Sequence, residues 1–257
     1  MLTLRVIPCL LLRGDGLIKT VKFKNERYVG DPINAIKIFN EKEVDELVVL
    51  DVLASAEHYK PRTEYVRNLA TECFMPLCYG GGITTLAEME ALFSAGVEKV
   101  AINTAALDNP DLIRAAAKEF GSQSIVVSLD VKKSFFGGYS VYSQRGTTDR
   151  KISPFDHVKL VEDLGAGEIF LNSVDQDGVR EGYDLDLLKK ICQIVTIPVI
   201  ACGGAGELTH FKAAADAGAS AVAAGSFFVF YGKHRAVLIT YPESSQIEQL
   251  NCPDLVK

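Results

Sequence analysis

The chain of 257 residues aligns with itself, without a gap, when it is shifted by 122 positions. Residues 75–105 read MPLCYGGGITTLAEMEALFSAGVEKVAINTA, and residues 197–227 read IPVIACGGAGELTHFKAAADAGASAVAAGSF. In this alignment Pro76 matches Pro198 and Val100 matches Val222. Unrelated strand–helix units share proline, glycine and alanine, but an ungapped match over about 30 residues indicates a true internal repeat. It predicts a fold made of two similar halves.

Short apolar, β-branched runs alternate with amphipathic stretches along most of the chain. The strand-like runs are residues 5–11, 46–51, 76–79, 99–103, 124–130, 168–172, 198–202 and 219–225. The helix-like stretches include residues 86–95, 110–120, 154–164, 184–195 and 208–217. Eight strand-then-helix units predict an α/β fold, a single (β/α)8 barrel of two half-barrels. A doubly wound open sheet is the alternative, but it requires a GxGxxG motif after the first strand, and none is present.

The composition indicates a soluble, globular chain. Hydrophobic residues make up 48%, and the net charge of −6 argues against a general binder of nucleic acid or anionic membranes. No apolar run approaches the ~20 residues of a membrane span, and the N-terminal segment is a poor signal peptide. We therefore expect a cytoplasmic protein. The barrel is predicted to span residues 1–242, and residues 243–257 to form a C-terminal tail whose flexibility stays open.

Neither a metal nor another cofactor is predicted. The cysteines contain no CxxC pair and mostly lie in apolar runs, which favours buried free thiols over disulfides or zinc ligands. They are Cys9, Cys73, Cys78, Cys192, Cys202 and Cys252. The histidines show no ligand spacing. They are His58, His157, His210 and His234.

Two glycine-rich loops, GGGI and GGAG, each follow a predicted strand and precede a predicted helix. The first contains Gly81 and Gly82, and the second contains Gly203 and Gly204. Backbone N–H groups are free at such junctions and no side chain blocks approach, so a phosphate can bind there. Tight turns without a ligand are the alternative. Two loops related by the repeat predict two phosphate sites on opposite sides of the barrel mouth, and hence a ligand with two phosphoryl groups.

Carboxylates close several of the predicted strands. Asp130 ends the run IVVSLD, where it would face the mouth, and we predict that it acts as a general acid or base, with a structural role as the alternative. Asp51 ends ELVVLD, and Asp175 and Asp177 follow IFLNS. For these three residues, bracing of loops and contact with a ligand are equally compatible with the sequence.

Charged residues also begin four of the predicted strands, at the opposite rim of the barrel. They are Arg5, Glu46, Lys99 and Glu168. Alternate residues of a strand share a face, so Arg5 shares a face with Cys9 and Leu11. If these faces point inward, two positive and two negative side chains form a ring at the barrel floor. The ring could close the barrel, which the packed interiors of such barrels favour, or it could gate an axial passage.

Taken together, these motifs resemble the cyclase subunit of imidazole glycerol phosphate synthase, from histidine biosynthesis. The resemblance covers residues 1–230 and includes RVIPCL, VGDPINAIKIFN, DELVVLDVLAS, PLCYGGGI, EKVAINTAAL, FGSQSIVVSLD, GAGEIFLNSVDQDG, GYD and IPVIACGGAG. It implies a barrel that works with a separate glutaminase subunit docked on its floor. Ammonia from glutamine would pass along the barrel axis to a bisphosphorylated ribulose-type substrate at the mouth, which is cyclised and cleaved.

The resemblance also implies roles for single residues. Asp130 matches a catalytic aspartate of the family, Lys19 matches the lysine of its mobile loop, and the charged ring matches its ammonia gate. The positions associated with substrate are Asp51, Gly82, Asn103, Asp177, Gly204 and Ser226, and we add Gly81, Asn172 and Gly203 to the expected ligand site. No glutaminase signature occurs in the chain, so a partner must supply the ammonia.

One departure from the family pattern is decisive. The family places a second catalytic aspartate at the end of the first strand, where this chain has Leu11 in CLLL. Leucine cannot transfer a proton, and loss of such a group typically costs a factor of 10²–10⁴ in rate. Smaller departures are Asn172, Cys202 and Ala101, where hydroxyl residues are usual, and Pro242, which shortens the expected last helix.

The segment GSFFVFYGKHRAVLITYP and the CLLL motif look like those of paralogues found with surface-polysaccharide genes. That resemblance implies a subunit that passes ammonia from its own glutaminase to a third enzyme, which amidinates an acetamido sugar. The histidine-pathway cyclase is the first alternative. A phosphosugar isomerase barrel without a partner is the second, and the charged floor and the missing acid/base group argue against it.

Overall fold

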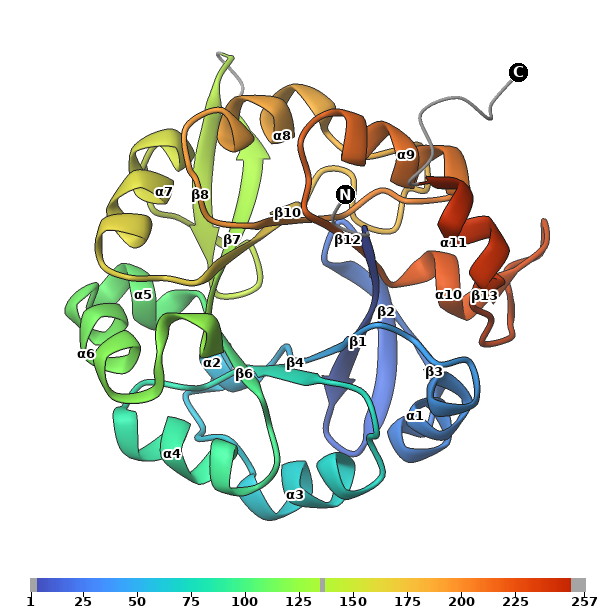
Figure 1. Ribbon diagram of the computed structural model, residues 1–257, viewed down its shortest axis with the longest axis horizontal. Helices are drawn as coiled ribbons and strands as arrows, with labels where there is room; N and C mark the ends of the chain where they lie inside the picture. Colours follow the sequence, from blue (N-terminus) through green and yellow to red (C-terminus); the bar gives the residue numbers. More distant parts are fainter. Residues whose placement is uncertain (1–3, 135–136, 251–257) are drawn as a thin grey trace.

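The computed structural model describes residues 4–134 and 137–250, which form a closed ring of strands surrounded by helices (Figure 1). Eight parallel strands pair in order around the ring, and the last pairs with the first. They are β1 (Arg5–Arg13), β4 (Leu47–Asp51), β5 (Leu77–Gly80), β6 (Lys99–Ile102), β7 (Ile125–Lys133), β10 (Glu168–Ser173), β11 (Val199–Cys202) and β12 (Ala221–Ala224). The predicted (β/α)8 barrel is thereby confirmed.

The helices cover the outside of the ring. They are α1 (Pro32–Glu41), α2 (Ala54–Glu57), α3 (Thr63–Thr71), α4 (Leu86–Ser94), α5 (Thr104–Asp108), α6 (Asp111–Phe120), α7 (Pro154–Asp163), α8 (Leu185–Cys192), α9 (Leu208–Asp216), α10 (Ser226–Val229) and α11 (Ser244–Leu250), with a 3-10 turn, η1, at Ser122–Ser124. Their starts follow from local sequence. Asp31 and Ser153 accept a hydrogen bond from the first turn and are followed by proline, and Thr85 forms a capping box with Glu88.

The internal repeat is reproduced residue for residue. A shift of 122 carries β5 onto β11, α4 onto α9 and β6 onto β12. It also pairs two contacts at the helix starts: Glu88 accepts a hydrogen bond from the Thr84 amide, and His210 accepts one from the Gly206 amide. The two halves therefore share their strands, helices and cap positions.

Each half also begins with a long strand that continues into an antiparallel hairpin, which the sequence did not predict. In the first half β1 is followed by β2 (Gly16–Val21) and β3 (Lys24–Gly30). In the second half β7 is followed by β8 (Tyr139–Ser143) and β9 (Thr148–Asp149). A third, shorter hairpin, β13 (Phe230–Tyr231) with β14 (Ala236–Val237), follows α10.

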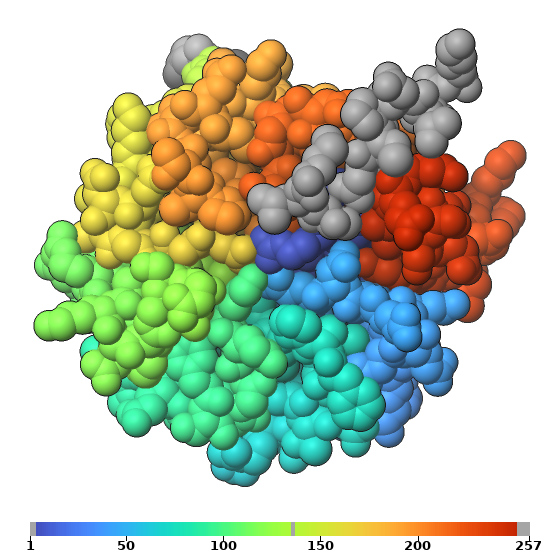
Figure 2. All heavy atoms as spheres, in the orientation of Figure 1, coloured from blue at the N-terminus to red at the C-terminus, as the bar shows by residue number. Residues whose placement is uncertain are grey.

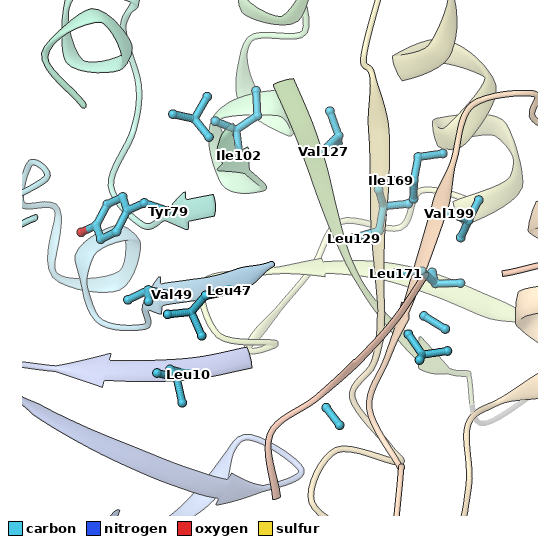
Figure 3. Close-up of a cluster of buried hydrophobic side chains, with 14 of the residues drawn as sticks. Leu10, Leu47, Val49, Tyr79, Ile102, Val127, Leu129, Ile169, Leu171 and Val199 are labelled. Atoms are coloured by element: carbon cyan, nitrogen blue, oxygen red, sulfur yellow. The ribbon is translucent and has the colours of Figure 1, made fainter. Parts of the chain in front are cut away.

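The hydrophobic core has two layers. The larger one lies between the outer face of the barrel and the helices, and Figure 3 shows part of it, including Leu47, Tyr79 and Ile169. The smaller one fills the barrel interior with the inward side chains of the strands. Its buried members are Ile7, Cys9, Val48, Cys78, Ala101, Val126, Phe170, Ile200, Ala221 and Ala223. The sequence alternates between these two layers along each strand, as a barrel requires.

The helix after β12, α10, already ends at Val229 and is followed by the β13–β14 hairpin, so Pro242 is not what shortens it; α11 begins two residues after Pro242. Ile247 and Leu250 of α11 pack against the outer core, so part of the predicted tail lies on the barrel.

Cys9, Cys73, Cys78, Cys192 and Cys202 are free thiols. Cys73, Cys192 and Cys202 are only partly buried, and Cys252 lies outside the described residues. Every described helix is too short or too polar to span a membrane.

Candidate functional site: the barrel axis from floor to mouth

The four charged residues predicted at the floor meet in a closed ring of ion pairs. Arg5 contacts Glu46 and Glu168, each at 2.6 Å, and Lys99 Nζ lies 3.0 Å from Glu46 and 2.9 Å from Glu168. Burial disfavours the charge on Lys99, but its hydrogen bond to Glu168 and the charge of Glu46 outweigh burial and raise its pKa. The four side chains of the ring are therefore charged, and each is paired with two side chains of opposite charge.

Above the ring, the barrel interior is apolar. Ile7, Val48, Val126 and Phe170 occupy it, together with the thiols of Cys9 and Cys78. Burial raises the pKa of Cys78 well above its usual value, so this thiol is uncharged. A small neutral molecule could move through such a medium at far lower cost than an ion, whose desolvation is expensive.

The mouth of the barrel holds a cavity of about 140 Å³, lined by residues of both halves. Ten of the residues expected at the site line it: Leu11, Lys19, Asp51, Gly81, Gly82, Asn103, Asp130, Asn172, Asp177 and Ser226. Gly203 and Gly204 are missing from this lining. Predicted site residues that are spread over most of the sequence are therefore brought to one end of the barrel.

Asp130 is partly buried at the wall of the cavity, between two amide side chains. Asn103 Nδ2 donates to its Oδ2 at 3.0 Å, and Asn172 Nδ2 donates to its Oδ1 at 3.3 Å. Burial raises the pKa of Asp130 to about 7, although the hydrogen bond from Asn172 opposes this shift. A carboxyl group with such a pKa can both accept and release a proton near neutral pH.

Lys19 also points into the mouth. Its side chain is 5% exposed, and its Nζ donates a hydrogen bond to the Cys9 carbonyl oxygen. Any side chain at Gly225 would collide with this ammonium group, so the glycine makes room for it. Burial lowers the pKa of Lys19, and the nearby Cys9 and Asp177 oppose that shift.

The β2–β3 hairpin carries Lys19 and is fixed across the mouth by Asp177 from the other half. Thr20 Oγ1 donates to Asp177 Oδ2 at 2.9 Å, and the Lys22 amide donates to the Asp177 carbonyl oxygen at 2.9 Å. Asp51 accepts from Tyr59 Oη at 2.6 Å, and Asp175 accepts from the Lys133 amide at 2.8 Å. All three aspartates left open by the sequence therefore brace loops in this structure.

The two glycine loops differ in their surroundings. Gly81 and Gly82 line the cavity, at positive φ of 124° and 71°. Gly203 and Gly204 are buried beneath residues 176–182, and the Gly182 amide donates to the Gly204 carbonyl oxygen at 2.8 Å. The predicted first phosphate loop is therefore accessible, whereas the predicted second loop is covered by a neighbouring segment.

Sequence reasoning missed several residues of the mouth. Phe23, Gln144 and Arg145 line the cavity, and Glu26 pairs with both Arg13 and Arg145. Phe23 and Glu26 lie on or beside the first hairpin, and Gln144 and Arg145 lie in the turn of the second. The signal was present in the period-2 alternation of YSVYS and in the turn residues between GLIKTV and KNERYVG.

Leu11 lies at the position of β1 where the resemblance leads one to expect a catalytic aspartate. It lies in β1 beside Leu50 of β4, packs against the interior core and lines the cavity. The two sides of the mouth therefore differ, because β7 presents the carboxylate of Asp130 to the cavity and β1 presents the hydrocarbon side chain of Leu11. No group of three or more cysteine, histidine or acidic side chains within residues 4–134 and 137–250 is arranged to hold a metal ion.

A closed (β/α)8 barrel with the Asp130 carboxylate and the buried Lys19 at its mouth has its candidate site at the face where enzymes of this fold have their active sites. The model of the histidine biosynthesis protein family matches residues 5–235. The chain belongs to this family, among the HisF-type cyclase subunits of imidazole glycerol phosphate synthase.

Three relatives illustrate the range of similarity. A Pseudomonas aeruginosa protein, provisionally named imidazole glycerol phosphate synthase subunit hisF2, is 58% identical over 95% of this chain and 98% of its own length. A Vibrio vulnificus relative, provisionally named subunit hisF3, is 48% identical over 96% of this chain and 95% of its own length. Imidazole glycerol phosphate synthase subunit HisF of Thermobifida fusca is 43% identical over 89% of this chain and 91% of its own length.

Proposed function

We propose that this chain is the ammonia-conducting subunit of a glutamine amidotransferase and serves a separate enzyme that amidinates a surface-polysaccharide sugar. The observation that carries the proposal is the contrast between the two ends of the barrel axis. The charged floor ring is complete, whereas the mouth has Leu11 where a two-carboxylate cyclase needs a proton-transfer group. Parts that guide ammonia are kept, and one half of the acid/base pair is absent.

The floor supports the docking of a glutaminase. Phe74, in the loop before β5, is 85% exposed, and the loops that precede barrel strands lie at the floor. Exposed aromatic side chains are enriched in protein interfaces. Ammonia released there would meet the ring of Arg5, Glu46, Lys99 and Glu168, which must separate to let it pass. The apolar interior above the ring favours neutral ammonia over ammonium.

The histidine-pathway cyclase is the second candidate, and a specific observation favours it. Asp130, with its pKa near 7, and Lys19 both line the cavity together with the accessible first glycine loop, so the parts that would hold a phosphorylated substrate and move a proton remain. In that case a group other than an aspartate at position 11 must transfer the second proton.

A reconstitution experiment distinguishes the two functions. The chain is combined with its cognate glutaminase, [amide-15N]glutamine and either the histidine-pathway bisphosphate substrate or the acetamido-sugar substrate with its amidinating enzyme. We expect 15N in the amidino group of the sugar, and no cyclised product at rates near 1 s⁻¹. Efficient cyclisation of the bisphosphate would overturn the proposal, as would the absence of any complex with the glutaminase at micromolar concentrations.

A further inference from the structure

The β13–β14 hairpin carries an exposed apolar surface that the proposed function does not use. Tyr231 is 64% exposed, Val237 is 42% exposed and Leu238 is 52% exposed. Tyr231 pairs with Ala236 on one face of this short ribbon, and Val237 pairs with the buried Phe230 on the other face. Figure 2 shows this segment standing out from the rounded outline of the barrel. Exposed apolar groups gathered in this way mark interaction surfaces.

Positive charge surrounds this apolar ribbon. Residues 217–242 contain no aspartate or glutamate, although the whole chain has a net charge of −6. Lys233 and Arg235 lie in the turn, and neither makes an ion pair with any residue in the described ranges. Burial lowers the pKa of Arg180, and the positive charge of Arg235 adds to that shift.

The hairpin follows β12 and α10 in the chain, and none of its residues, 230–237, lines the cavity. Its Phe230 ring packs beneath the Arg27 guanidinium of β3, with 5.0 Å from Cζ to the ring centroid. The hairpin is therefore in contact with the element that carries Lys19. Arg180 belongs to the segment that covers the second glycine loop, and it donates to the Gly206 carbonyl oxygen at 3.4 Å.

We propose that the β13–β14 hairpin, with its basic rim of Arg27, Arg180, Lys233 and Arg235, is the docking surface for the enzyme that consumes the ammonia, through an acidic face on that enzyme. This inference rests on the proposed function. Aromatic and arginine side chains are favoured at the centre of protein interfaces, and opposite charges at the rim steer the partner into place. Docking there sets the partner against the β2–β3 hairpin, whose Lys19 and Thr20 line the cavity.

Other occupants fit the surface less well. A second copy of this chain would bring a like-charged patch against this one if the contact were symmetric. A nucleic acid would meet the repulsion of a chain whose net charge is −6. An acidic protein surface complements the local charge without facing either difficulty.

The test measures the affinity of the purified amidinating enzyme for the complex of this chain with its glutaminase. One variant reverses the rim charges, Lys233→Glu with Arg235→Glu, and a second removes the apolar contact, Tyr231→Ala. The matched controls are Lys118→Glu with Lys159→Glu, two exposed lysines of α6 and α7, and Leu160→Ala, an exposed leucine of α7. None of these residues belongs to the floor ring or lines the cavity, so glutaminase binding serves as a check on folding.

We expect each hairpin variant to weaken binding of the amidinating enzyme about 10-fold or more, and the controls to change it less than 2-fold. Binding by the unaltered chain should also weaken as salt rises. Equal effects of hairpin and control variants would overturn the proposal. So would absence of a complex at 50 μM of each protein (roughly the weak limit for a transient pair), or hairpin-dependent self-association of the chain.

A second readout separates this proposal from the proposed function. With glutamine as the nitrogen source, the hairpin variants should lose sugar amidination, and a saturating ammonium salt should restore it. If the unaltered complex fails to amidinate the sugar from glutamine, the proposed function fails, whereas the binding measurements still decide whether the hairpin docks the enzyme.

Discussion

Asn172 Nδ2 donates a hydrogen bond to Asp130 Oδ1 across 3.3 Å, and the Asn172 Oδ1 atom is left without a partner in the described part of the chain. The amide therefore supports the carboxylate of Asp130 from one side while Asn103 supports it from the other. The environment is polar enough to hold the ion and buried enough to penalise it, which explains a pKa near 7.

Replacement of Asp130 by asparagine should stabilise the fold, most strongly above pH 7. The pKa of Asp130 rises from 3.8 to about 7 on folding, so the native state binds the proton more tightly and stability falls as pH rises through this window. At 1.36 kcal/mol per unit, the full effect is of the order of 4 kcal/mol. Urea denaturation of both proteins at pH 5 and pH 8 checks this.

The gap in unfolding free energy between Asp130→Asn and the unaltered protein should widen from pH 5 to pH 8. The control is Asp149→Asn, at an exposed carboxylate whose pKa is lowered by hydrogen bonds from Ser140 and Lys151. Its effect should have the opposite sign, since that carboxylate is better stabilised in the folded state as an ion. If the difference in unfolding free energy between Asp130→Asn and the unaltered protein were the same at pH 5 and pH 8, the pKa of Asp130 would not lie between these two values.

Replacement of Glu46 by glutamine should destabilise the protein by about 3–5 kcal/mol, because it leaves two cations sharing Glu168 in a buried ring. The control is Asp111→Asn, which removes an exposed ion pair with Arg114 and should cost under ~1 kcal/mol. Unfolding free energies at low and high salt provide the measurement. If both variants lost a similarly small amount of unfolding free energy, water within the ring would be screening its charges from one another.

Replacement of Gly204 by alanine should destabilise the barrel by more than ~2 kcal/mol, since a Cβ there would overlap the Gly182 carbonyl oxygen at a φ of 117°. Gly14→Ala is the matched variant. Its φ of 58° is also left-handed, but the site is open, so about 1 kcal/mol is expected. Thermal or urea unfolding decides between them. Equal losses would show that residues 176–182 move away from the second glycine loop at little cost.

Replacement of Leu11 by aspartate should raise ammonium-dependent cyclisation of the histidine-pathway substrate by a factor of about 10² or more, provided that the rest of the site is intact. Leu11→Asn is the control for polarity without proton transfer and should gain little. Steady-state turnover with saturating ammonium at alkaline pH measures both. A kcat near 1 s⁻¹ for the unaltered chain would contradict the proposed loss of cyclase chemistry.

Much of the barrel was predictable because its strands and helices each depend on short-range periodicity. The run from Lys99 to Asn103 reads as a strand in isolation, and the structure ends it one residue earlier, at Ile102. The floor ring was also predictable, since a residue at a strand start inherits its direction from the alternation of the strand. Arg5 and Glu46 meet because their strands are neighbours in the barrel.

The covering of the mouth could not be predicted in the same way. Asp177 accepts hydrogen bonds from a hairpin 157 residues away in sequence, and no local pattern encodes that contact. The burial of Gly204 under Gly182 likewise depends on the path of a loop. The sequence of both glycine loops is nearly the same, so their difference in access arises from what neighbouring segments place over them.

The two hairpins that follow β1 and β7 meet above the cavity, where Arg145 of the second pairs with Glu26 of the first. Each half of the barrel thus contributes one hairpin to the cover of the cavity, but the two contributions differ. The first hairpin carries Lys19 and Glu26, and the second supplies Arg145 as the counterpart to Glu26, so two similar halves form a mouth with distinct sides.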